Sequence, residues 1–384
     1  MSKNITRFFI ILVLVFCMLF TSKLYASDLI IEETANTLKL SDMIDSLNEY
    51  KENSEIGKEL ELDDIAQNLI TGKNTDYSKI IQKILDIFAS NVISVLKNGI
   101  AILIVIVLIG IFSSLELDKS STVSKITFLI AYIVIVTILA NMYVGVIESY
   151  RKTISILTAV MQTVTPFVMI VMVFSGGIVS SNLIQPMILF IASLVGFLIN
   201  YIVIPFVTIS IVMKIVSSFS DKVRLNRLGD LFSKSGLWIT SVVFTLFLSV
   251  ISVKGSITTS VDSTVIKTTQ TAVSNFIPVV GKFVSDSLES IMGATEVIGK
   301  TAGVIGIIVM CVVAITPIIQ MLVIFLAHKV LAALAETLTD NKNTIGIIDR
   351  FAETYKVLLG ILIGVLALFV MSSGVLIKLI GNIT

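Results

Sequence analysis

The chain has 384 residues, of which 55% are hydrophobic and only 14% are charged, and its formal net charge is +1. A soluble fold of this length could not bury so much apolar surface. The near-neutral charge argues against nucleic acid as a partner. With two cysteines and one histidine, neither a disulfide framework nor a Cys/His metal site can be assembled. The sequence has no P-loop, nucleophile elbow or dinucleotide motif, so we expect no cofactor, no metal and no enzymatic activity.

Residues 1–26 have the layout of a secretory signal peptide. Lys3 and Arg7 form a short basic region, an apolar run from Phe8 to Phe20 follows, and Ala26 precedes a cleavage position at Ser27. The apolar run is short for a membrane span. An uncleaved signal anchor is the alternative interpretation.

Residues 27–98 are predicted to form an extracytoplasmic, acidic and amphipathic helical region. Between Ser27 and Lys83, acids clearly outnumber bases, and Leu38, Leu40, Ile44 and Leu47 are spaced for one helical face. This region is either a solvated helical cap or a docking surface for another protein. The amphipathic stretch Ser78–Asn98 is expected to lead into a membrane span that ends near Phe112.

Residues 99–384 are predicted to form a polytopic membrane domain. A helix needs about 20 apolar residues to cross a hydrocarbon core of about 30 Å. The following runs contain no Asp, Glu, Lys or Arg: Ile126–Ile147, Ile178–Met213, Ser235–Val253, Thr301–Ala327 and Val357–Ile377. We therefore expect an all-α integral membrane bundle with about six spans, plus two broken helices at 154–176 and 256–292 that are re-entrant or interfacial.

Positive charge predicts the orientation of the bundle. The loop Lys214–Ser235 is rich in bases, and His328–Lys356 is a plausible second cytoplasmic loop. Both loops lie in the cytoplasm only if the two broken segments do not cross the membrane. Lys222, Arg224 and Arg227 are candidates for contact with anionic membrane lipids or with a cytoplasmic partner.

Proline spacing suggests an internal repeat. Pro166 and Pro205 are separated by the same distance in sequence as Pro278 and Pro317. The offset between the two pairs predicts parallel repeats over residues 123–234 and 235–346, as in some transporters and channels.

The two broken segments are the candidate functional regions, because uncharged polar side chains recur in them at helical spacing beside prolines and glycines. One interpretation is a pair of re-entrant hairpins that line a conduit. The other is a pair of interfacial helices whose hydroxyls bond back to the backbone. The conduit-lining candidates are Ser155, Thr158, Gln162, Thr165, Pro166, Gly176, Gly177, Gln270, Ser274, Asn275, Pro278 and Gly281.

Four short motifs occur in order along the chain: Thr122–Lys125, Ser175–Gly177 with Pro186 after it, Val250–Gly255 and Asn275–Gly281. With these motifs, the chain resembles the stage III sporulation protein AE family. The resemblance implies a multi-pass protein of the mother-cell membrane that surrounds the forespore. It also implies that other stage III A proteins and, indirectly, the stage II Q protein are its partners. It supplies no catalytic residues.

The function that we predict is that of an integral membrane subunit of the secretion-like sporulation channel that links mother cell and forespore and is needed for late forespore development. Two alternatives remain open. The chain could be an independent secondary transporter of a small solute, or a membrane scaffold that recruits the other subunits through Ser27–Lys83 and the basic loop.

Overall fold

The computed structural model describes residues 28–54, 56–59, 61–71, 78–115, 122–219, 225–247, 249, 280–339 and 342–383. The predicted signal peptide lies outside these residues. Within them the regular structure is entirely helical. Its elements are α2 (Asp28–Thr37), α3 (Leu40–Lys51), η1 (Gly57–Glu59), α4 (Leu62–Thr71), α5 (Ser78–Leu115), α6 (Thr122–Phe174), α7 (Ile178–Leu198), the π-turn η2 (Ile199–Val203), α8 (Ile204–Phe219), α10 (Val280–Leu338) and α11 (Lys342–Ile383), with a further helix at 226–247.

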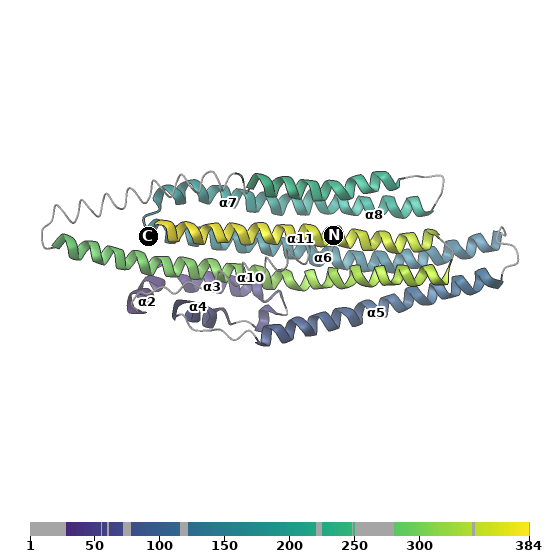
Figure 1. Cartoon of the computed structure of the whole chain (residues 1–384), viewed down its shortest axis with the longest axis horizontal. Coiled ribbons are helices and arrows are strands. Elements are labelled where there is room, and N and C mark those ends of the chain that lie inside the picture. Colours follow the sequence, from purple (N-terminus) through teal and green to yellow (C-terminus); the bar gives the residue numbers. More distant parts are fainter. Residues whose placement is uncertain are drawn as a thin grey trace.

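The long helices run side by side along one axis, with α10 and α11 at the centre (Figure 1). Helices α7, α8 and 226–247 cover one side of this pair, and α2, α3 and α4 pack against α10 on the other. Five helical stretches are long and apolar enough to cross a membrane: Gln82–Ile111, Leu129–Phe174, Ser181–Ser218, Ser290–Leu338 and Asn343–Gly381. They confirm the predicted all-α polytopic class. Of the predicted span 235–253, residues 235–247 are helical.

The prediction of a broken helix at 154–176 is wrong. Helix α6 continues from Thr122 through Pro166 to Phe174 as one element of 53 residues, about 80 Å long at 1.5 Å per residue. Proline removes one helical hydrogen bond and crowds the preceding turn. Here Val164, Thr165 and Val168 on either side of it are fully buried, and packing of this kind holds a proline-containing helix together inside a bundle.

The second predicted broken segment, 256–292, can be compared with the structure only in part. Residues 256–279 lie outside the described residues, and the remainder forms the first turns of α10. The turn that ends α6 lies at Gly176 and Gly177. Gly176 has a φ of 90°, and the N–H groups of Gly176 and Gly177 donate to the carbonyls of Val173 and Met172, as in a Schellman cap.

The predicted repeat is not matched by the helix boundaries. At the predicted offset, the reversal at Ser175–Gly177 corresponds to residues 287–289, which lie inside the continuous helix α10. Of the prolines that the repeat would pair, Pro205 follows a π-turn whereas Pro317 lies inside α10. Pro278, the counterpart of Pro166, lies outside the described residues.

Three glycines let α10 approach its neighbours closely. A Cβ atom at Gly299 would lie 2.7 Å from Val171, and one at Gly306 would lie 2.7 Å from Val164, both on α6. One at Gly303 would lie 2.5 Å from Ile377 on α11. The contacts also fix α6 and α10 in one antiparallel register.

The described parts of the two basic loops lie at the same end of the bundle, as a shared cytoplasmic side requires. The guanidinium of Arg350, near the start of α11, donates to the carbonyl oxygen of Lys214, near the end of α8, at 2.9 Å, and also to the Ser218 hydroxyl. The end of α8 is thereby tied to the start of α11.

We expect Gly306→Ala to destabilise the bundle, because its new methyl group would overlap Val164. Overpacking of this kind costs about 1–3 kcal/mol. A second change, Val164→Ala, should recover part of the loss. The measurement is thermal unfolding of the purified protein in detergent.

Gly293→Ala is the matched control, because nothing lies within 4 Å of a Cβ at that position. It should leave stability unchanged or raise it slightly. Equal effects of Gly306→Ala and Gly293→Ala would contradict the packing of α10 on α6.

Candidate functional site

The polar residues predicted on α6 face a matching set on α7 and η2. Gln162 Nε2 donates to Ser193 Oγ at 3.1 Å, and Asn200 Nδ2 donates to Ser155 Oγ at 3.5 Å. Between these bonds, a Cβ at Gly196 would lie 2.7 Å from Thr158 Oγ1. Together these contacts form an antiparallel polar seam between α6 and α7, which we call the α6–α7 seam.

The α6–α7 seam lies deep within the apolar part of α6 and is open on one side. Gln162 and Ser155 are exposed and Thr158 is partly buried. Hydroxyls in the seam also bond back to their own helices, as Thr158 does to Ile154 and Ser193 does to Leu189. The arrangement is that of interhelical hydrogen bonds in a membrane bundle, with an edge that can meet water or another subunit.

A π-turn adjoins the seam. In η2 the N–H of Ile204 donates to the carbonyl oxygen of Ile199, and Pro205 follows immediately. The wider turn accommodates a proline that cannot donate to the helix. Asn200 Oδ1 is buried and has no hydrogen-bond partner among the described residues. Single π-turns of this kind often mark functional sites in helices.

The remaining predicted conduit residues do not join the seam. Thr165 is fully buried, and its hydroxyl finds no partner in the described part of the chain. Pro166 is partly buried inside α6, and Gly176 and Gly177 form the α6–α7 turn. Gln270, Ser274, Asn275 and Pro278 lie outside the described residues, and Gly281 belongs to the first turn of α10.

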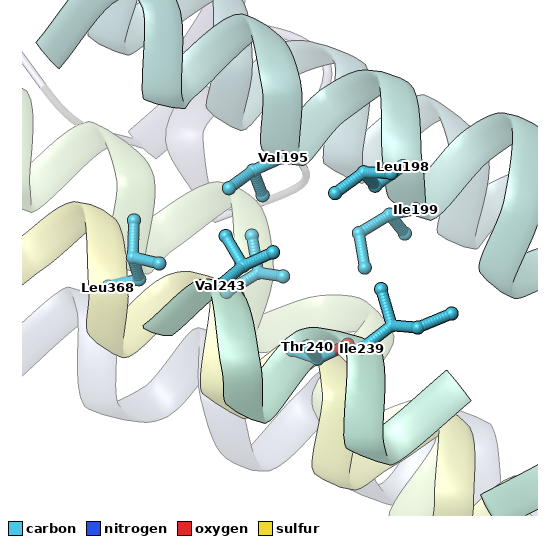
Figure 2. Close-up of a pocket in the computed structure, with 8 residues that line it drawn as sticks. Val195, Leu198, Ile199, Ile239, Thr240, Val243 and Leu368 are labelled. Atoms are coloured by element: carbon cyan, nitrogen blue, oxygen red, sulfur yellow. The ribbon is translucent and has the colours of Figure 1, made fainter. Parts of the chain in front are cut away.

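A small cavity lies close to the seam but is almost entirely apolar. Figure 2 shows Val195, Leu198 and Ile199 facing Ile239, Thr240, Val243 and Leu368 across it, and Val365 completes the lining. The Thr240 hydroxyl is engaged with the carbonyl oxygen of Gly236. The cavity is thus a packing gap between α7, helix 226–247 and α11, without convergent polar groups for a ligand.

Ion pairs gather at the end of the bundle that carries the basic loops. Lys329 Nζ lies 2.6 Å from Asp349 Oδ1 and 2.8 Å from Glu353 Oε1, which joins α10 to α11. Lys214 lies 3.0 Å from Asp230, which joins α8 to helix 226–247. Of the predicted lipid or partner contacts, Arg227 is exposed here, and Lys222 and Arg224 lie outside the described residues.

The described residues contain no group of three or more His, Cys, Asp and Glu placed to hold a metal ion. The single histidine, His328, is buried against Tyr355, with its Nδ1 2.7 Å from the carbonyl oxygen of Ile324. The fold and its sites therefore define a polytopic α-helical membrane protein whose polar groups join helices to one another.

Comparison with known proteins assigns the family. The family model for stage III sporulation protein AE matches residues 60–379, and the chain belongs to this family. It is 29% identical over 220 residues to the stage III sporulation protein AE of Bacillus subtilis (strain 168). The match covers 57% of this chain and 55% of the relative. No solved structure matches the chain.

We expect the pair Gln162 and Ser193 to show a coupling of about 0.5–1 kcal/mol, since interhelical hydrogen bonds in membrane bundles average about 0.6 kcal/mol. The measurement is a double-mutant cycle with Gln162→Leu and Ser193→Ala, read by reversible unfolding in detergent. Gln162→Leu combined with Thr137→Val is the control, because Thr137 bonds within its own helix. A coupling near zero in the first cycle would contradict the seam.

The ion pairs generate a second prediction. Lys329→Glu should lower the unfolding temperature, because it places three carboxylates together, and adding Asp349→Lys should restore most of the loss. For half-exposed groups the effect is about 1 kcal/mol and shrinks at high salt. Lys378→Glu, at an exposed position near the far end of α11, is the control and should have little effect.

Proposed function

We propose that this protein is an integral membrane subunit of the channel complex that links mother cell and forespore during sporulation. The observation that carries the proposal is family membership across residues 60–379, combined with a bundle whose long apolar helices are joined by polar contacts. The stage III sporulation protein AE of Bacillus subtilis is a relative by sequence. The site of action is the mother-cell membrane around the forespore.

The bundle supports a structural role in that complex rather than chemistry of its own. Helices α6 and α10 are 53 and 59 residues long, about 80 and 90 Å at 1.5 Å per residue, which is far more than a hydrocarbon core of about 30 Å requires. Their ends extend beyond the bilayer, where other stage III A proteins can contact them. Through such proteins, the stage II Q protein of the forespore is an indirect partner.

Uptake of a small solute by the chain alone is the weaker hypothesis. The central helices have no charged residue between Thr301 and Ala327 or between Val357 and Ile377. Coupled transporters usually place an ionisable residue at such depths. The polar groups of the α6–α7 seam are largely engaged with one another.

The test is deletion of the gene in the organism that carries it, followed by a reporter for late forespore gene expression. We expect engulfment to finish and the late reporter to stay silent. The wild-type gene and the Gly293→Ala variant should both restore it. Full reporter activity and normal spores in the deletion strain would contradict the proposal.

A further inference from the structure

The acidic helices α2 to α4 are attached to α10 at an unexpected depth. The hydroxyl of Ser54 donates to the carbonyl oxygen of Val312 at 3.0 Å and lies 3.5 Å from Thr316 Oγ1. Ser54 itself is 4% exposed. The contact therefore lies inside the interface between the acidic helices and α10.

Val312 lies near the middle of the uncharged run of α10. It follows Lys300 by twelve residues and precedes His328 by sixteen, about 18 and 24 Å along a helix. Pro317 helps to explain why the contact forms here. It leaves the neighbouring carbonyl of Val313 without its helical donor, and the carbonyl oxygen of Val312 has a second lone pair that can accept the Ser54 hydroxyl.

Apolar packing stabilises the contact between the acidic helices and α10. Leu47, Ile56 and Leu62 from the acidic region are fully buried, and a Cβ at Gly57 would overlap the carbonyl of Lys51, so the chain is tightly folded there. On α10, every residue from Thr301 to Met310 is buried. This part of α10 is therefore enclosed by protein.

The opposite face of the same region is strongly charged. Its exposed acids are Glu33, Asp42, Asp45, Glu49, Glu52, Glu61, Asp63 and Asp64, beside the exposed bases Lys39 and Lys58. Charged side chains are strongly unfavourable in hydrocarbon. Glu52, two residues from Ser54, is among these exposed acids, so charge lies close to the depth of Val312, where contact with lipid tails is strongly unfavourable.

The outward surface of α7 is apolar at the same depth. Gly306 of α10 faces Val164 of α6, so in this antiparallel pair Val312 lies level with Thr158. Thr158 faces Gly196 of α7, and the next residue, Phe197, is 54% exposed. An apolar ring that points outward at this level fits a lipid environment.

We propose that the bundle is two-sided at membrane depth: the α7 side contacts lipid, and the side covered by α2 to α4 borders a water-filled space. The inference rests on the proposed function in one respect, since it assigns this water-filled space to the channel. It places the aqueous space beside the acidic helices and not along the α6–α7 seam.

The first part of the test is a disulfide. In a full-length chain with Cys17→Ser and Cys311→Ser, the pair Ser54→Cys and Thr316→Cys should cross-link in native membranes. The pair Ser46→Cys and Thr316→Cys should not, because Ser46 lies on the outer face and bonds to Asp42. Absence of the 54–316 cross-link would overturn the attachment.

The second part places a fluorescent thiol probe at Glu52→Cys or at Phe197→Cys in the cross-linked protein, reconstituted in nanodiscs. We expect iodide to quench the probe at residue 52 several-fold more strongly than at residue 197, and spin-labelled lipid tails to give the reverse order. Quenching by lipid tails at residue 52, or its absence at residue 197, would overturn the two-sided arrangement. These outcomes do not depend on the sporulation phenotype, so either proposal can fail alone.

Discussion

The close approach of α10 to α6 and α11 is the constraint on which the rest of the structure depends. Gly299 and Gly306 let the α10 backbone reach the side chains of Val171 and Val164, and Gly303 does the same for Ile377. Without a hydrophobic driving force between helices in lipid, small residues that permit close packing are a principal source of association. Because three contacts on one helix must be satisfied together, they set the register of its neighbours.

That register brings polar groups from distant parts of the chain to one level. Ser54 reaches α10 at Val312, which is level with Thr158 at the centre of the α6–α7 seam. The acidic helices and the seam therefore lie at one depth on opposite sides of an apolar core made by α10 and α11. In a low-dielectric interior, such polar groups must bond to each other or meet water. The α6–α7 seam and the acidic helices satisfy this requirement in different ways. The seam pairs its groups internally, whereas the acidic face keeps its charges exposed.

Local sequence patterns predicted features that depend on neighbouring residues, such as the buried face of a helix. The buried face of α3 follows the predicted spacing, with Leu40, Ile44 and Leu47 all buried. Gly176 supplies the positive φ of the α6–α7 turn, and Gly299, Gly303 and Gly306 of α10 mark close contacts, whereas Gly293 does not. The polar stripe on α6 could be predicted from the sequence. Its hydrogen-bond partners, Ser193 and Asn200, could not.

The failures come from interactions between distant residues. Pro166 predicts a break if only its own turn is considered, yet packing on both sides carries α6 through it. The bond from Ser54 to Val312 joins residues 258 positions apart, and nothing in either local sequence indicates it. Equal proline spacing suggested a repeat, but whether a proline ends, bends or merely interrupts a helix is decided by its neighbours in space.

The most direct measurement is a disulfide that reports the register of α10. A Cβ at Gly299 would lie 3.5 Å from the Cβ of Val171, which is within the range found in disulfides. With both native cysteines replaced by serine, Gly299→Cys and Val171→Cys should cross-link in native membranes, whereas Gly303→Cys and Val171→Cys, one turn out of register, should not. Equal cross-linking of the two pairs, or cross-linking of the second alone, would contradict the register and with it the depth of every polar contact described above.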